Sequence, residues 1–562
     1  MFIRKKSRYD KKVAIQICDN WRENGKIRQK VLRHIGTADP KDTDTINRYM
    51  IAAEFHKTEL ENERKAAQLA IAPNLPFKIP ETYPSNKPIS TEQSSQATNE
   101  AEELWVDIAK CVEQSRAIEG IHEVFGSTLD KFGLETLIGK RQYNVLREII
   151  MAKIALPSSK LKASENLAKK FNVTLPVEKI YRLMDALEAR EGPVQAALFN
   201  TFRPLIGEKV DVLFFDVTTL YFESDQEDEL RRFGFSKDQK THLTQVVLAL
   251  ASTKEGLPVG YKLFPGNTAE TSTLLKAIEE WQEFLQIDQI TIIADRAMMS
   301  EANIAMLEAS QMKYVIASKL KLLPKYLQEE ILSRAKEKVV FQKDNDILSI
   351  QEHSHAGRRL IVSHSTKRAR KDVKDREEIL KKLRTKIGLK GSTKKLVTNR
   401  GYLSIIREEG NSRISIDEEK VTASARWDGL HGVLTNIQEA GHEEILGLYR
   451  RLWVIEESFR ISKHTLEMRP VYHFAARRVK AHILLSYIAF AVCRYVQKRI
   501  AIQYKELSVD KIRSLLIDVQ YSLIRDEKTD IIYRLPSKMS VEAKKIYSVF
   551  NLKRERYLTK VA

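Results

Sequence analysis

The spacing of apolar and polar residues divides the chain into stretches of different periodicity. Near the N-terminus, two runs with strand-like alternation, VAIQIC and KIRQKVLRHI, are separated by NWRENG, whose Asn-Gly pair favours a tight turn. They predict a β-hairpin, and a helix is expected to follow from Thr43 to Leu69. Between Ile71 and Glu100 the periodicity is lost. Five of the fifteen prolines lie there, so we expect an extended or disordered linker without a core of its own.

A helical period runs from Ala101 to Phe202. Within it, a break at Asn172–Pro176 separates two short helices, which could form a helix-turn-helix or a plain α-hairpin. The break lacks a turn glycine, which favours the α-hairpin. At Val210 the pattern changes to three strands, a helix, a strand, a helix and a strand. This order predicts a mixed α/β sheet.

Seven consecutive regions are expected. They are a basic β-hairpin with a helix that binds DNA (1–70), a linker (71–100), a helical DNA-binding region (101–205), the first part of an α/β core (206–320), a β-rich insertion with a basic stretch (321–435), the last part of the core (436–500), and a helical C-terminal region that could dimerise (501–562).

Net charge narrows the class of partner. The chain carries 94 Lys and Arg against 75 Asp and Glu, a formal charge of +19, which favours nucleic acid or an anionic membrane surface. The longest apolar run, ILLSYIAFAV, is too short to span a membrane and predicts a buried helix. The N-terminus is not expected to be a signal peptide. Three scattered cysteines form neither a disulfide framework nor a metal cluster, which fits a reducing cytoplasm.

The positive charge is concentrated in two segments. Met1–Arg33 holds eleven Lys and Arg against three Asp and Glu, and Thr366–Lys395 holds thirteen against four. A solvated helix face explains the EEILKKLRTK part of the second segment, but not its excess charge. Both segments are therefore candidates for contact with a polyanion.

Two acidic residues close apolar strands of the predicted sheet. Asp216 ends VLFFD, and Asp295 ends IIAD. The carboxyl ends of core strands are where α/β sheets place ligands, and two buried acids there invite a divalent cation. Each acid alone is better explained as a helix N-cap.

The helical stretch YRRLWVIEESFRISKH supplies a third acid. Glu456 and Lys463 are seven residues apart and so share one helix face. A metal-binding carboxylate and a phosphate-binding ammonium on one face suit cleavage of a DNA backbone. A surface helix with Glu–Arg pairs is the alternative, but it leaves the apolar residues Leu452, Trp453 and Phe459 unexplained.

Asp216, Asp295 and Glu456, on strand, strand and helix, resemble the triad of DDE transposases with a ribonuclease H-like core. Tyr449, Glu456 and Lys463 are similar to the Tyr-x2-Arg-x3-Glu-x6-Lys signature of the cut-and-paste insertion-sequence branch. Leu452 departs from the signature at its Arg position, where Arg450 or Arg451 could compensate. IADR, GNTAE, DGLHGVLTN and EMRPVYH also resemble this branch, and the likeness covers about Val210 to Val492.

The resemblance implies a fold and a chemistry. The fold is an α/β, ribonuclease H-like mixed sheet with a β-rich insertion before the last catalytic helix, accompanied by the N-terminal hairpin and helical DNA-binding regions. The three acids would bind Mg²⁺, with Mn²⁺ as a substitute, for two-metal cleavage of element ends and transfer of the 3'-hydroxyl strand into target DNA. The residues expected to contact DNA are Tyr449, Arg450, Arg451, Arg460, Lys463 and Arg296.

Further expectations concern partners. Relatives flip a base against an aromatic residue, and the candidates for that role here are His431 and Trp427. The partners implied are double-stranded DNA, as terminal inverted repeats and as target, and a second copy of the chain in a homodimer on two ends. No membrane partner is expected, and the location implied is the bacterial cytoplasm, in association with the nucleoid.

Three other functions are compatible with parts of the pattern. One is a nuclease of the same fold that cuts DNA without joining it. Another is a domesticated, non-catalytic DNA-binding protein, which the presence of all three acids disfavours. A glycosidase with paired acids is the most distant alternative, disfavoured by the positive charge and by the shortage of aromatic residues around the acids.

Overall fold

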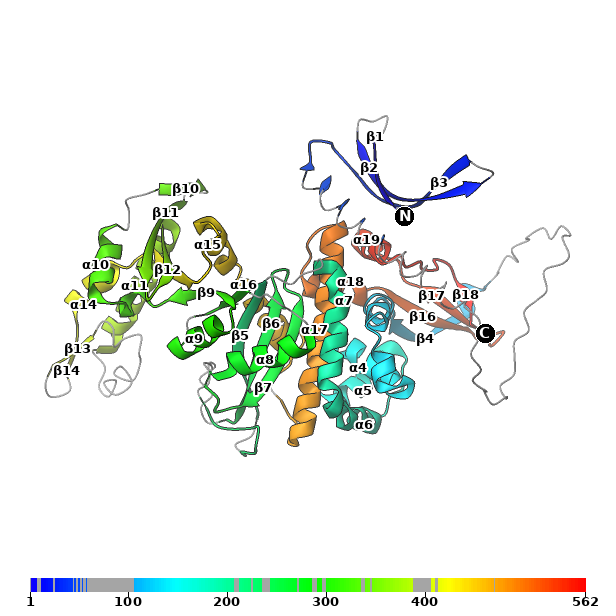
Figure 1. Cartoon of the computed structure of the whole chain (residues 1–562). Helices are drawn as coiled ribbons and strands as arrows, with labels where there is room; N and C mark the ends of the chain where they lie inside the picture. The colour runs from blue at the N-terminus through cyan, green and yellow to red at the C-terminus, as the bar shows by residue number, and fades with distance from the viewer. Residues whose placement is uncertain are drawn as a thin grey trace. The chain divides into compact units, whose positions relative to one another are not determined.

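The structure of the protein is a computed structural model (Figure 1), which describes residues 2–7, 12–23, 26–43, 45–46, 49–50, 53, 57, 106–206, 212–223, 226–234, 243–269, 272–285, 291–295, 300–334, 339–343, 346–387, 406–409, 413–469 and 471–561. The chain forms two compact units. One comprises Met1–Leu183 and Ile488–Ala562, and the other comprises Met184–Tyr487. The predicted linker Ile71–Glu100, most of the predicted helix Thr43–Leu69, and Arg296 lie outside the described residues.

The first unit begins with a three-stranded antiparallel sheet. Its strands are β1 (Phe2–Ser7), β2 (Val13–Glu23) and β3 (Lys26–Ala38). The predicted hairpin is confirmed as β2 and β3, and β1 adds a strand to it. Alternation along β2 buries Ile15 and Ile17 on one face, where they pack with Ala53.

The rest of the first unit combines helices with a second sheet. Its helical elements are η1 (Ile108–Lys110), the π-helix η2 (His122–Gly126), α2 (Ser127–Asp130), α3 (Leu134–Ile138), α4 (Lys140–Ala155), α5 (Lys160–Phe171), α18 (Val509–Ile517) and α19 (Val541–Val549). The helix α6 (Val177–Leu187) begins in this unit. Asn172, at φ 55°, ends α5 in the left-handed conformation and separates it from α6, at the predicted break.

The second sheet of this unit differs from the expectation of purely helical regions. It has the order β18-β17-β16-β4, from β4 (Cys111–Ile118), β16 (Gln520–Asp526), β17 (Ile532–Pro536) and β18 (Thr559–Lys560). Among the described residues, 101–205 thus contains one strand, and 501–562 contains three strands beside α18 and α19. β4 pairs with β16, about four hundred residues away along the chain, and local periodicity carries no information about such a partner.

The second unit is built on a nine-stranded mixed sheet. Its order is β10-β11-β12-β15-β9-β8-β5-β6-β7. The strands are β5 (Val212–Tyr221), β6 (Gln245–Thr253), β7 (Pro258–Pro265), β8 (Thr291–Ala294), β9 (Lys313–Ser318), β10 (Val339–Lys343), β11 (Asp346–His355), β12 (Arg358–Ser365) and β15 (Leu430–Thr435). β5, β8 and β9 are parallel, and the other pairs are antiparallel. The predicted mixed α/β sheet is confirmed.

Helices cover both faces of this sheet. One face buries a large apolar core under α8 (Thr273–Leu285), α9 (Glu301–Ala309), the short η6 (Leu320–Leu322) and α10 (Lys325–Ser333). The other face carries α15 (His442–Arg450), packed on β8 and β9, and α16 (Trp453–Arg460), packed on β5 and β6. The unit also contains η3 (Glu188–Arg190) and α7 (Glu191–Ile206), which packs on β7.

Between β12 and β15 the chain makes an excursion that leaves and returns to neighbouring strands. It contains α11 (Thr366–Ile387), β13 (Ile406–Glu409), β14 (Arg413–Ile416) and α14 (Glu418–Ala425). Leu383 and Ile406 form a small apolar core of its own. At its base, the Ser365 amide donates to the Gly429 carbonyl at 3.0 Å. The predicted β-rich insertion, 321–435, thus contains helices as well as strands, and its strands β10, β11, β12 and β15 extend the main sheet.

One described helix, α17 (Ala476–Gln503), is long and apolar enough to cross a membrane, and 94% of its apolar window is buried in the protein. The buried core helix of a folded protein passes the same test of length and composition. Passing this test is therefore not sufficient to identify a membrane span. The run from Ile483 to Val492 is buried within it. The predicted buried helix is therefore confirmed.

Candidate active site

The two aspartates occupy equivalent places on adjacent parallel strands. In the β5–β8 ladder Phe215 pairs with Ala294, so Asp216 and Asp295 form the next step of the same register. Neighbouring strands of a sheet are about 4.8 Å apart. The register therefore places both carboxylates side by side at the end of β8, as their positions after apolar runs predicted.

Both aspartates belong to the sheet face opposite the large apolar core. Phe215 and Val217 contribute to that core, as do Ile292 and Ala294. Because successive strand residues point to opposite faces, Asp216 and Asp295 belong to the face that carries α15 and α16. One oxygen of Asp216 accepts the Val217 amide at 2.7 Å.

The segment that follows α16 brings a cation to this face. The π-helix η7 (Ile461–Thr465) continues α16, and its Lys463 ammonium donates a hydrogen bond to the Thr218 hydroxyl. Thr218 is buried and lies two residues after Asp216, hence on the same face of β5. The ammonium also lies 5.7 Å from the ring centroid of Phe459. Lys463 is thus held beside the strand that carries the first acid.

The third acid of the predicted triad faces a cavity. Glu456 is exposed on α16 and lines a cavity of about 790 Å³ together with Tyr449 and His431. The cavity opens at the end of the sheet where β12 ends and β15 begins, which is also the end where β8 stops at Asp295. Glu456 therefore lies at the same edge and face of the sheet as the aspartates, whereas neither aspartate lines this cavity.

The neighbouring acid has a different environment. Glu457 is half-buried and forms an ion pair with Arg460 at 3.6 Å. Arg460 is exposed and does not line the cavity of Glu456.

The signature positions before Glu456 differ in burial and in their place along the cavity wall. The rings of Tyr449 and His431 are stacked at an angle, with centroids 4.9 Å apart. Leu452 is largely buried, with 9% of its surface exposed, and it lines the cavity from within the wall. Arg450 lines the cavity beside Glu456, whereas Arg451 is exposed and does not line it. Of the two candidates for the missing guanidinium, Arg450 has the better position.

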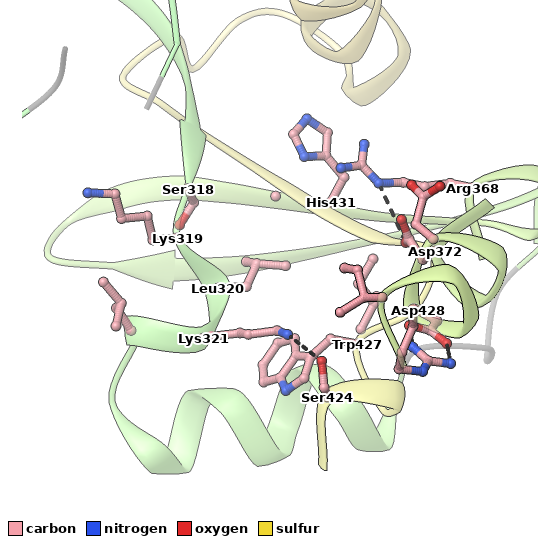
Figure 2. Close-up of a pocket in the computed structure, with 16 residues that line it drawn as sticks. Ser318, Lys319, Leu320, Lys321, Arg368, Asp372, Ser424, Trp427, Asp428 and His431 are labelled. Carbon is pink, nitrogen blue, oxygen red and sulfur yellow. Dashed lines mark hydrogen bonds and ion pairs between the residues drawn. The ribbon is translucent and has the colours of Figure 1, made fainter. Parts of the chain in front are cut away.

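A second cavity, of about 610 Å³, is also lined by residues of α11 (Figure 2). The two cavities share Arg368, Asp372, Asp375 and His431 in their walls. Trp427 lines only the second one and packs against the large apolar core. The two base-flip candidates therefore differ, because His431 reaches the cavity of Glu456 and Trp427 does not.

Two residues of the site are not singled out by the sequence pattern. Trp453 lines the cavity of Glu456 with 55% of its surface exposed, which is unusual for an indole and suits stacking on a base. The sequence pattern indicates only that this residue packs against something. Its position three residues before Glu456 is the one feature of the sequence that could have pointed to a place in the site. Thr218 could have been found from the period of β5, two residues after Asp216.

The ligand chemistry of the acids suits a hard divalent cation, since carboxylate oxygens are what Mg²⁺ prefers. Asp216 and Asp295 fit as a pair through their register. Within the described part of the chain, however, no three or more His, Cys, Asp or Glu side chains are grouped closely enough to hold a metal ion. A metal site that includes Glu456 therefore requires this side chain to turn from its cavity towards the aspartates.

Comparison with known proteins gives a family. A solved structure, the cryo-EM structure of a piggyBac transposase synaptic complex with hairpin DNA, is similar at 10% identity over 71% of this chain and 76% of that one, with a TM-score of 0.36. No curated protein was found to match. The model of the transposase DDE domain matches residues 208–492, half of the chain and the part that carries all three acids. The chain therefore belongs to the family of transposases with a DDE domain.

Proposed function

We propose that this protein cleaves the ends of a transposable element and joins the freed 3'-hydroxyl strand to target DNA. The observation that carries the proposal is the register of β5 and β8, which sets Asp216 and Asp295 side by side on the face that also receives Lys463. Two acids and a cation at one strand edge suit a phosphodiester held beside a divalent ion.

The three acids have distinct positions in the proposed site. Asp216 and Asp295 would hold the ion from the sheet, and Glu456 would complete the site from α16. Bound Mg²⁺, or Mn²⁺ in its place, would activate the attacking oxygen and stabilise the leaving one. The order β7-β6-β5-β8-β9, with β6 antiparallel to its neighbours, supports a ribonuclease H-like core for this arrangement.

The DNA backbone would lie along the cavity of Glu456. Tyr449 and Arg450 line this cavity, and Lys463 lies near Asp216, so all three are placed to hold phosphates close to the cut. Trp453 and His431 offer rings to an unstacked base in the same cavity. Arg451 and Arg460 are exposed on the same segment and would contact DNA further away.

The first positively charged turns of α11 extend this surface. Lys367, Arg368 and Lys371 line the cavity of Glu456, which makes the start of the basic stretch Thr366–Lys395 a candidate contact for DNA. We further propose a homodimer that holds two terminal inverted repeats together with target DNA, in the bacterial cytoplasm.

The proposal is tested by measuring strand cleavage of duplexes that carry the DNA sequences flanking the gene. Asp216→Asn, Asp295→Asn and Glu456→Gln should each abolish Mg²⁺-dependent strand cleavage, because each removes a ligand charge, and should leave binding to the DNA ends largely intact. Glu457→Gln is the matched control, since this adjacent acid pairs with Arg460, and it should retain cleavage.

Two results would overturn the assignment. Cleavage by the Asp216→Asn or Asp295→Asn protein at the rate of the wild type would remove the aspartates from the site. Equal losses in Glu456→Gln and Glu457→Gln would show that the helix, rather than Glu456, is being disturbed. Joined products, measured with a separate target duplex, distinguish a transposase from a nuclease that only cuts.

A further inference from the structure

A strongly basic cavity lies near the C-terminus, in the unit that does not contain the three acids. It encloses about 800 Å³ between the end of β17, the helix α19 and the segment that follows it. Its charged lining residues are Lys538, Lys544, Lys553, Arg554, Glu555 and Arg556. Five cations thus face one acid.

One of the five cations has a structural role. Arg554 donates to the Ser537 carbonyl at 2.7 Å and to the Gln520 carbonyl, and it forms an ion pair with Glu119 at 3.0 Å. Glu119 also pairs with Arg534. These bonds tie the segment after α19 to β16 and to the loop after β17, so the wall of the cavity is fixed by the fold.

The other four cations are available to a ligand. Lys538, Lys544, Lys553 and Arg556 are all exposed, and within the described residues none of them has an acidic partner. By contrast, two other lysines of this unit, Lys505 and Lys511, both form ion pairs with Glu542. The four unpaired charges therefore concentrate a positive potential over one hollow.

We propose that this cavity binds the phosphate backbone of duplex DNA, as a contact separate from the active site. The inference rests on the proposed function, which supplies DNA as the polyanion. The exposed cations come from segments before, within and after α19. Such an arrangement suits a DNA backbone that passes over all of them. An isolated phosphate ion would instead need buried, convergent donors. Three of the four are lysines, which act as point charges, so the contact positions DNA without reading its sequence.

The salt dependence of DNA binding measures this contact. A variant with Lys538, Lys544, Lys553 and Arg556 changed to Ala is compared with the full-length wild type on a fluorescent duplex of random sequence. Each phosphate that the protein no longer neutralises lowers the log–log salt slope by about 0.9. If the variant releases roughly two to four phosphates, its fall in affinity between about 50 and 200 mM salt should be roughly 10 to 150 times smaller than that of the wild type.

A control with the same change of charge carries Lys254→Ala, Lys276→Ala, Lys325→Ala and Lys528→Ala, four exposed lysines that line none of the cavities described. Its slope should stay close to that of the wild type. Thermal unfolding of both variants checks their fold, and a single Lys544→Glu variant repeats the test with minimal change. Slopes that are equal in the cavity variant, the Lys544→Glu variant and the control would overturn the inference.

Strand cleavage separates this inference from the proposed function. If the wild type cleaves DNA and the cavity variant keeps the salt slope, only the C-terminal contact is wrong. If the wild type binds DNA with the expected slope but never cleaves it, the proposed function fails while the contact stands. Retention of the wild-type slope together with weakened binding of inorganic phosphate would assign the cavity to a small anion and overturn DNA as its ligand.

Discussion

Replacing Lys463 by Met should slow strand cleavage far more than it weakens DNA binding. The ammonium of Lys463 donates to the Thr218 hydroxyl, two residues along β5 from Asp216. Methionine keeps most of the aliphatic stem, so the change removes mainly the charge, with its hydrogen bond to Thr218 and its contact with the Phe459 ring. Thr218→Val is the companion variant, because it deletes the hydroxyl acceptor and preserves the shape of the side chain.

The expected magnitudes differ between the two variants. A single preorganised donor beside a reacting centre is worth roughly 100- to 1,000-fold in rate, and this is the loss expected for Lys463→Met. The hydrogen bond to Thr218 has a charged donor and so contributes about 1.5 to 3 kcal/mol, or roughly 10- to 150-fold, which is the upper limit of the smaller loss expected for Thr218→Val. Binding should weaken only modestly, because one phosphate contact among several changes the salt slope by about 0.9.

Single-turnover cleavage of end DNA, with binding measured separately in Ca²⁺, resolves the two effects. The double variant completes a double-mutant cycle. Once Lys463 is absent, Thr218→Val should have little further effect on the cleavage rate. Equal rate losses in the two single variants would refute the reasoning, since Lys463 would then serve only to anchor Thr218. A Lys463→Met enzyme that cuts at the rate of the wild type would refute it as well.

Other outcomes follow from the same structure. Arg450→Ala should reduce cleavage at least tenfold, and Arg451→Ala should not, because only Arg450 lines the cavity of Glu456; similar rates in both would count against the substitute guanidinium. Leu452→Ala should destabilise the protein by about 2 to 4 kcal/mol in chemical denaturation, as expected for truncating a buried leucine. Arg359 holds the pKa of Glu352 down at about 2, so this carboxylate favours folding above its ordinary pKa and the benefit is lost as pH falls towards 2. Glu352→Gln should therefore flatten the acid side of the unfolding profile, and an unchanged profile would exclude this ion pair as a contributor.

Part of the candidate site could be predicted because its residues lie at the ends of apolar strands. Asp216 and Asp295 each follow a run of buried residues, and strand ends of this kind meet at one edge when the strands are parallel. The burial of Leu452 could be predicted from its chemistry alone. In both cases the relevant information is local, so single-sequence patterns were sufficient.

The direction in which a side chain points from a helix is harder to predict from the sequence. Seven-residue spacing puts Glu456 and Lys463 on one face of a regular helix. The helix changes to a π-helix after Arg460, so Lys463 turns to Thr218 while Glu456 faces the cavity. Pairings between remote segments are equally hard to predict. β4 is flanked by helical sequence, and its partner β16 lies near the other end of the chain.

The excursion between β12 and β15 has a consequence for how this chain can change over time. Because it leaves and rejoins the sheet through one hydrogen-bonded pair of residues, Ser365 and Gly429, its ends are close whatever lies between them. It has a small core of its own, and Trp427 also anchors it to the large core of the sheet. Such a segment can be exchanged, lengthened or lost as a cassette without altering the strand order beneath it. Lineages of this enzyme can therefore diverge in what α11 contacts while the strands that carry Asp216 and Asp295 stay as they are.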